Sequence, residues 1–232
     1  MKISSLLEIG RGVTALIGGG GKTTLIYTLA EELTAKGSVI ICTSTHIRVP
    51  GQYMLVTGGG RELRDALKKE RCVCAGTPAE NGKLTAPSVS FKELEAVADY
   101  VLVEADGAKG LPLKAHAPHE PVIPENSGQV ILVVGADGLG KMIKEACHRP
   151  EIWAKLAGTS PECPATPEGE ARVILSEGYG DRVFINKAES ARECELAEEL
   201  AELIHRPAVI GSLKRGSFAS FNIGALDSEE GM

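Results

Sequence analysis

Short runs of consecutive apolar residues alternate along this chain with longer segments in which apolar residues recur every three or four positions. The runs are apolar at nearly every position, which is typical of parallel strands covered on both faces. The predicted strands are residues 13–17, 39–43, 100–104, 130–134, 183–185 and 208–210. Strands that alternate with helices predict a doubly wound, mostly parallel α/β sheet.

The first helix is predicted at residues 24–36. Leu25, Leu29 and Leu33 lie four positions apart there, so they fall on one face of a helix. Gly37 follows and is predicted to end the helix, because glycine adopts the left-handed conformation of a helix C-cap without steric cost.

Two further helices have a capping box at their start, in which a serine is followed three residues later by a glutamate. Ser90 with Glu93 predicts a helix that runs to about residue 98. Ser190 with Glu193 predicts another that runs to about residue 205. Both helices fall between predicted strands and support the alternating pattern.

Residues 50–87 interrupt the alternation. They contain a short helical pattern near residues 61–70, and then the runs CVCAG and KLTA on either side of Asn81-Gly82. An Asn-Gly pair between two such runs is a signal for a β-hairpin. We therefore expect a small β/α insertion after the second strand, placed as a flap over the site described below.

Composition narrows the class of protein. The chain has 232 residues, 25 Lys plus Arg against 31 Asp plus Glu, and a net charge of −6, which argues against a nucleic-acid or anionic-membrane surface. No apolar run approaches the roughly 18 residues that span a bilayer, so we expect a cytoplasmic protein. Six scattered cysteines favour reduced thiols over a disulfide framework or a structural metal site.

The sequence GGGGKTT lies between the first predicted strand and the first predicted helix. Glycines let backbone N–H groups face phosphate oxygens, although each costs roughly 1 kcal/mol of backbone entropy. The predicted nucleotide-binding glycines are Gly18, Gly19, Gly20 and Gly21. The strict phosphate-loop pattern has a glycine five residues before Gly21, whereas this chain has Leu16, so the loop is a variant.

The three residues after the glycines carry the chemistry expected of a phosphate loop. Lys22 is predicted to reach the β- and γ-phosphates, and the Thr23 hydroxyl to bind Mg²⁺. Thr24 is predicted to lie near the α-phosphate. The start of the following helix adds free N–H groups and the positive end of a helix dipole.

A second acidic motif ends the strand at residues 100–104. Glu104 and Asp106 both stand where a carboxylate that organises Mg²⁺ belongs, and we expect Glu104 to share the ion with Thr23. Asp106 is the alternative group for polarising a nucleophile, and Gly107 completes an E-x-x-G pattern. Hydroxyls at residues 43–45 end the neighbouring strand and are candidates for orienting water.

The strand at residues 183–185 is followed by Asn186, Lys187 and Glu189. The pattern Asn-Lys-x-Asp after a late strand reads guanine, because its carboxylate accepts two hydrogen bonds from the base. Here a glutamate replaces the aspartate. The residues therefore lean toward GTP, and ATP stays open as the nucleotide.

Six polar residues outside the phosphate loop are candidates for a second substrate, or for a switch loop that moves with nucleotide state: Lys109, Lys114, His116, His119, Glu120 and Arg149. His116, His119 and Glu120 have a spacing that suits a metal ion on a helix. Prolines surround them, however, which favours solvated loop histidines. Arg149 suits a phosphate contact or a charge at a helix end.

The chain resembles the YqeC family in several long stretches. They are ALIGGGGKTTLIYTLAEEL, VIICTSTHI, ADYVLVEADGAKGLPLKAHAPHEPVIP, VVGADGLGKMIKEACHRPEIWAKLAG and VFINKAES. Leu16 fits the loop of this family, whereas Glu189 and residues 114–116 vary from its pattern. The resemblance implies a P-loop nucleotide-binding fold and an accessory role in maturing a selenium-dependent molybdenum hydroxylase. The E-x-x-G pattern also resembles the metallochaperone GTPases that load nickel enzymes.

Together these residues predict a single P-loop nucleotide-binding domain over residues 1–232, with GTP or ATP and Mg²⁺ as ligands. Catalysis is assigned to Lys22, Glu104 and Asp106, which position and stabilise the transferring phosphoryl group. The resemblance implies that the hydroxylase is the protein partner of this chain. Neither a nucleic acid nor a membrane is expected as a partner. A small-molecule kinase or ligase and a non-hydrolysing, nucleotide-gated adaptor remain alternatives, and the sequence does not predict an oligomeric state.

Overall fold

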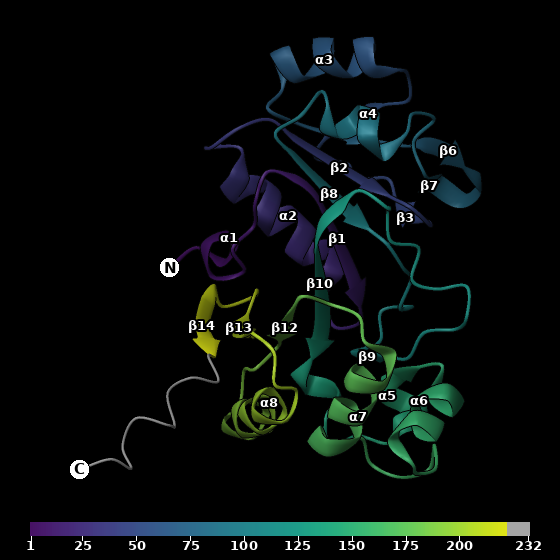
Figure 1. Cartoon of the computed structure of the whole chain (residues 1–232), viewed down its shortest axis with the longest axis vertical. Coiled ribbons are helices and arrows are strands. Elements are labelled where there is room, and N and C mark those ends of the chain that lie inside the picture. The colour runs from purple at the N-terminus through teal and green to yellow at the C-terminus, as the bar shows by residue number, and fades with distance from the viewer. Residues whose placement is uncertain (222–232) are drawn as a thin grey trace.

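The computed structural model describes residues 1–221. Within them, one sheet has the strand order β14-β13-β12-β10-β1-β8-β2-β5-β4 (Figure 1). In that order the strands are Ser217–Phe221, Ala208–Ser212, Arg182–Asn186, Ser127–Gly135, Gly12–Gly18, Tyr100–Glu104, Val39–Thr43, Cys72–Ala75 and Met54–Val56. All neighbours are parallel except β14, which runs antiparallel to β13. The six predicted strands and the mostly parallel α/β class are confirmed.

Strand β1 lies at the centre of the sheet, between β8 and β10. Leu16 is paired with Glu104 on one side, and Gly18 with Val133 on the other. Because the strands are parallel, the residues that follow them emerge at one edge of the sheet, where ligands of such folds bind. The glycine loop and the acidic motif therefore meet at this edge.

Helices cover both faces of the sheet, as predicted for a doubly wound fold. Side chains of β1 and β8 alternate between the two faces, with Leu16 and Leu102 toward α2 and Ile17 and Val103 toward the opposite layer. One layer consists of α1 (Ile3–Leu6) and α2 (Lys22–Leu33). The other consists of α3 (Gly60–Lys69), α4 (Phe91–Glu95), α5 (Ile143–Ala146), α6 (Pro150–Ala157), α7 (Pro167–Glu177) and α8 (Ala191–Leu203).

The insertion after β2 divides into two parts, and the prediction for it is wrong in one of them. Strands β4 and β5, with α3 between them, extend the main sheet beyond β2. The CVCAG run is therefore not a hairpin arm, because its apolar residues are buried against β2. The hairpin itself is confirmed, with arms β6 (Thr77–Ala79) and β7 (Lys83–Thr85) around the turn η1 (Glu80–Gly82). With β3 (Ile47–Arg48) these arms form a small antiparallel sheet that we call the flap.

Helices α4 and α8 begin where the sequence predicts, whereas α2 begins at Lys22, earlier than the predicted residue 24, and all three end earlier than predicted. Both capping boxes are present, on α4 and on α8. Helix α2 ends at Leu33, and Gly37 does not adopt a positive φ angle as expected of a C-cap. Glycine is needed at position 37 for a different reason, because a Cβ there would lie 2.5 Å from a carboxylate oxygen of Asp99.

Residues 107–126 pass over the carboxyl edge of the sheet before β10 begins. A short strand within them, β9 (Leu113–Lys114), pairs in parallel with β11 (Cys147–His148). A turn of 3-10 helix, η2 (Ala136–Gly138), follows β10 and leads into α5–α7. Through the pairing of β9 with β11, the segment before β10 connects the phosphate-loop edge of the sheet to the layer formed by α5, α6 and α7.

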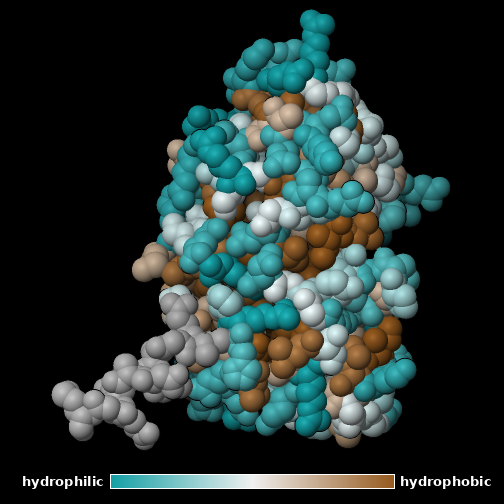
Figure 2. Space-filling view, in the orientation of Figure 1, coloured by the Kyte–Doolittle hydropathy of each residue, from teal (hydrophilic) through white to brown (hydrophobic). Residues whose placement is uncertain are grey.

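The surface is mixed in character. On the face shown in Figure 2, hydrophobic residues form several separate areas between hydrophilic ones. Large apolar side chains that are exposed include Val49, Met54, Val122 and Leu175, which are far apart in the sequence except for Val49 and Met54. Among the helices within residues 1–221, none combines the length and the apolar character needed to cross a bilayer.

Candidate functional site

The loop between β1 and α2 packs so closely on its neighbours that it requires glycine. Gly18 and Gly20 have positive φ angles of 93° and 73°. A Cβ on Gly18 would lie 2.3 Å from the carbonyl oxygen of Val133, and one on Gly20 would lie 2.3 Å from the amide nitrogen of Gly135. The glycines therefore let the loop lie directly against the end of β10.

The backbone N–H groups of the loop divide into two sets. The first three donate within the protein: Gly18 to Asp106 Oδ2 (2.8 Å), Gly19 to the Val133 carbonyl (2.9 Å) and Gly20 to the Leu111 carbonyl (3.1 Å). The first turn of α2 closes with a bond from the Leu25 N–H to the Gly21 carbonyl (3.0 Å). The N–H groups of residues 21–24 precede that bond and form the donor end of the helix. The N–H groups of Gly18, Gly19 and Gly20 therefore already have acceptors within the protein, and the donor end of α2 begins at Gly21.

Lys22 is buried at the base of this loop, with 4% of its surface exposed. Its ammonium donates to the carbonyl oxygen of Gly18 at 2.5 Å and lies 2.9 Å from Oδ1 of Asp106. Lys22 also lines the pocket above the loop, so its charge borders both the carboxylate and the open space. The lysine that the sequence assigns to phosphate is thus held by a buried aspartate in this structure.

Thr23 and Glu104 meet, as the sequence predicts for a shared magnesium ion. The Thr23 hydroxyl donates to Oε2 of Glu104 at 2.7 Å, and both residues line the pocket. Burial raises the pKa of Glu104, although the Lys22 charge and the Thr23 hydrogen bond oppose that rise. A hydroxyl and a carboxylate oxygen are hard ligands of the kind that Mg²⁺ accepts beside phosphate oxygens and water. The donor set therefore fits the ion.

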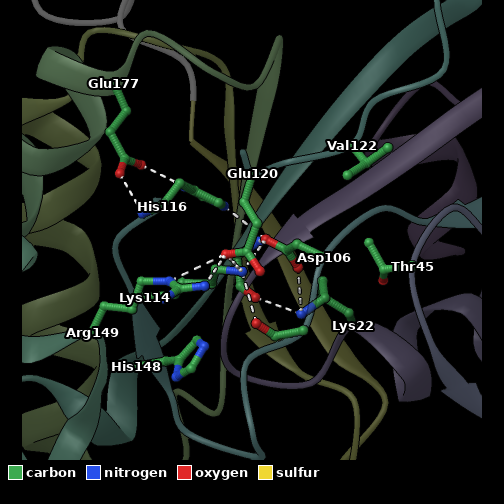
Figure 3. Close-up of polar contacts among 12 residues, drawn as sticks. Lys22, Thr45, Asp106, Lys114, His116, Glu120, Val122, His148, Arg149 and Glu177 are labelled. Carbon is green, nitrogen blue, oxygen red and sulfur yellow. Dashed lines mark hydrogen bonds and ion pairs between the residues drawn. The ribbon is translucent and has the colours of Figure 1, made fainter. Parts of the chain in front are cut away.

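Asp106 is the centre of a buried ionic cluster (Figure 3). It is completely buried and lies within 3.1 Å of Lys22 and Lys114 and 2.7 Å from His116 Nε2. Burial alone would raise the pKa of Asp106, but the His116 hydrogen bond and the charges of Lys22 and Lys114 outweigh it and hold the pKa well below its ordinary value. Asp106 is therefore an ionised anchor for three cations rather than a group facing the pocket.

His116 bridges Asp106 to the end of helix α7. Its Nδ1 lies 2.7 Å from Oε2 of Glu177, and its backbone N–H donates to Oε1 of the same carboxylate at 2.6 Å. Burial lowers the pKa of His116, but the hydrogen bonds to Asp106 and Glu177 prevail and raise it. With a carboxylate at each ring nitrogen, the imidazole is a double donor and carries a positive charge.

The other end of the cluster is closed by Glu120. One oxygen of Glu120 lies 3.1 Å from the Lys114 ammonium and 3.0 Å from the Arg149 guanidinium. Arg149 stands in the left-handed conformation directly before α6. Lys114 and Arg149 are thus committed to internal ion pairs, which contradicts the expectation of a second-substrate pocket built from them.

A pocket of about 580 Å³ opens above the loop, between the glycines and the flap. Its lining residues that matter here are residues 19–24, Thr45, Arg48, Lys83, Glu104, Gly107, Lys109, Glu120 and Lys187. Three flap residues line it, Ile47, Arg48 and Lys83, so the flap borders the site as expected. Of the three hydroxyls that end β2, Thr45 borders the pocket, whereas Thr43 is buried and donates to the Glu104 carbonyl at 2.7 Å.

The resemblance of this chain to a known family can be compared with matches to known proteins. The family profile described as YqeC protein matches residues 14–151. This chain belongs to the YqeC family. An uncharacterized YqeC protein from Escherichia coli (strain K12) is 36% identical over 163 residues, which are 65% of this chain and 62% of the relative. This chain therefore spans less than two thirds of that relative's length.

Among solved structures, the YqeC chain is similar to the signal recognition particle 54 kDa protein from Aeropyrum pernix K1 in complex with GDP. The match has a TM-score of 0.43 and 16% sequence identity, and it covers 92% of this chain and 44% of that one.

The residues predicted to contact the nucleotide base lie close together at the ends of β12 and β13. Asn186 donates from Nδ2 to the Gly20 carbonyl at 2.8 Å and accepts from the Leu213 N–H at 3.0 Å, so it braces the phosphate loop. Lys187 lines the pocket and pairs with Asp137 at 3.1 Å. Glu189 accepts from the Ser212 hydroxyl at 2.9 Å. The late-strand motif is thus one connected unit with the glycine loop.

Two features of the YqeC site differ from the sequence interpretation or escape it. His116 is buried, so the preference for a solvated loop histidine is wrong, whereas His119 is exposed. Among residues 1–221, no group of three His, Cys, Asp or Glu side chains is placed to hold a metal ion. Glu177, the second carboxylate that contacts His116, could not be predicted from the local sequence, because it lies 61 residues away at the end of α7.

Proposed function

We propose that this chain is a Mg²⁺-dependent nucleoside triphosphatase that acts as an accessory factor in maturing a selenium-dependent molybdenum hydroxylase. The contact that carries the first part is the 2.7 Å hydrogen bond between Thr23 and Glu104, at the start of α2 and beside Lys22. A helix N-terminus, a lysine and an oxygen pair for a divalent cation are the elements that bind and polarise a terminal phosphate. The accessory role is supported by the family resemblance alone.

The proposed mechanism relies on positioning and charge. The N–H groups of residues 21–24 bind phosphate oxygens, and Lys22 turns from Asp106 toward the terminal phosphate. Mg²⁺, when bound, neutralises charge on the phosphates. Thr23 and Glu104 would hold the ion, and Asp106 acts as a positioning residue for Lys22, because it lies 2.9 Å from the Lys22 ammonium and no part of it is exposed. Thr45, which lines the pocket, is the hydroxyl proposed to orient the attacking water.

The nucleotide is GTP or ATP, and the base-side residues favour GTP. The carboxylate of Glu189 uses one oxygen for Ser212, and its second oxygen lies 3.7 Å from the Lys214 ammonium. That second oxygen is the acceptor proposed for guanine. Asn186 contributes indirectly, by fixing the phosphate loop to the turn after β13.

The proposal is tested by calorimetric titration of metal-free protein with GTP, ATP and CTP, with and without Mg²⁺. We expect Mg²⁺-dependent binding that prefers GTP and falls by about a hundredfold in Lys22→Ala, since a charge-assisted contact is worth about 3 kcal/mol. Lys36→Ala is the matched control, because Lys36 is exposed beyond the end of α2. Unaltered binding by Lys22→Ala would overturn the assignment of this loop.

Release of phosphate from the bound nucleotide separates the proposed triphosphatase from the adaptor alternative. Slow turnover that stops in Glu104→Gln supports the triphosphatase. Binding of the same nucleotide without any turnover supports a nucleotide-gated adaptor.

A further inference from the structure

Three cations of the pocket have no internal partner and are not used by the proposed mechanism. The pocket is lined by Lys22, Arg48, Lys83, Lys109 and Lys187 against only two carboxylates, Glu104 and Glu120. Glu120 is neutralised by Lys114 and Arg149, Lys187 pairs with Asp137, and Lys22 pairs with Asp106. Within residues 1–221, no ion pair involves Arg48, Lys83 or Lys109. The pocket therefore carries three positive charges that no carboxylate within residues 1–221 pairs with.

Two of these cations stand side by side in the flap. Arg48 on β3 and Lys83 on β7 are direct cross-strand partners, and both are exposed. Like charges directly opposite one another destabilise an antiparallel pair. A shared anion would remove that repulsion, and Arg with Lys supplies several donors for phosphate oxygens.

The third cation reaches the same pocket from the loop after β8. Lys109 has a φ angle of 51°, a left-handed conformation that costs a non-glycine residue energy. It is exposed and flanked by Ala108 and Gly110, which also line the pocket. Cations from two separate parts of the chain therefore converge on one space.

The order of strands places this space beyond the end of a nucleotide. The base-side residues follow β12 and β13, the phosphate loop follows β1, and the flap begins just after β2. In the sheet these strands lie in the order β13-β12-β10-β1-β8-β2. A nucleotide with its base near Glu189 and its phosphates at Lys22 thus points its terminal phosphate toward the flap.

We propose that Arg48, Lys83 and Lys109 form a second anion subsite, which binds the phosphate group of a small phosphorylated molecule beside the terminal phosphate of the nucleotide. The subsite rests on the proposed function, because it is defined by its place beyond that terminal phosphate. It keeps Lys109 from the second-substrate residues predicted by the sequence and leaves out Lys114, His116 and Arg149, whose charges are internally paired. A molecule held there occupies the side from which an acceptor approaches the terminal phosphate in line.

Inorganic phosphate is the probe for this subsite. It is titrated by calorimetry into protein already saturated with Mg²⁺ and a β,γ-methylene analogue of the preferred nucleotide. We expect one saturable phosphate to bind, and the double variant Arg48→Glu/Lys83→Glu to weaken it by about tenfold or more while binding the analogue as the parent does. Arg64→Glu/Lys92→Glu is the matched control, since it makes the same charge change at exposed positions outside the pocket.

Two results would overturn the subsite: no phosphate binding to the loaded parent protein, or a loss of analogue affinity in the double variant as large as its loss of phosphate affinity. The second result would mean that the flap cations contact the nucleotide itself. If the parent protein binds no analogue, the proposed function fails by itself. Phosphate is then titrated into Lys22→Ala protein, where binding that Arg48→Glu/Lys83→Glu weakens supports the subsite and absence of binding refutes it.

Discussion

His116 is the residue whose environment departs furthest from what its neighbours in the sequence suggest. It sits in a proline-rich segment, yet its ring is buried between Asp106 and Glu177. Removal of one partner from a buried ionic cluster leaves the others uncompensated, which costs much more than the loss of a surface ion pair. The stability of the loop edge therefore depends on a charged imidazole.

The consequence is a pH-dependent effect of His116→Ala. We expect the variant to lose about 3–5 kcal/mol of unfolding free energy, the usual cost of breaking a buried pair. Because the folded-state pKa of His116 is raised, its contribution is fully present below the ordinary histidine pKa of about 6.5 and is lost as pH rises through the folded-state value. Urea unfolding at several pH values measures this, with His119→Ala as the exposed control. A destabilisation that does not shrink at alkaline pH would contradict a charged His116.

At the scale of elements, the conformation of the glycine loop depends on its close packing against the end of β10. Gly20 has a positive φ angle, and a Cβ there would meet the backbone of Gly135. We expect Gly20→Ala to lower the melting temperature by several degrees and to reduce nucleotide affinity. The added Cβ would force the glycine loop and the end of β10 at Gly135 apart. Gly51→Ala, where a Cβ meets nothing within 4 Å, is the control. Equal melting temperatures for the two variants would show that the loop can relax.

Elements with a local signal are predictable from the sequence, and those that depend on distant pairing are not. The six central strands are continuous apolar runs, and the starts of α4 and α8 carry their own capping boxes. Strand β4, by contrast, has only three residues with one of them buried, so its role as a sheet edge depends on β5. The contact between Thr23 and Glu104 follows from strand order, whereas the bridge from Asp106 to Glu177 requires the packing of α7.

On the scale of the whole molecule, the proposed accessory role predicts that the activity of the hydroxylase depends on the nucleotide site of this chain. In cells that lack this chain, we expect the hydroxylase to accumulate without selenium and without activity. The parent chain restores both, Lys22→Ala restores neither, and Lys36→Ala restores both. Selenium content of the purified hydroxylase, measured by mass spectrometry, decides the matter. Full selenium loading without this chain would remove the accessory role and leave the triphosphatase untouched.

The pairing of Lys22 with Asp106 also implies a form of selectivity. The Lys22 ammonium already donates to the Gly18 carbonyl and lies beside a buried carboxylate, so every ligand of the loop shares its charge and its three donors with an anion inside the protein. A triphosphate with its metal and its base contacts can win that competition. Free phosphate brings neither, and is thereby disfavoured at the loop. The carboxylate works as an internal competitor, which lets the loop reject abundant small anions without any steric barrier.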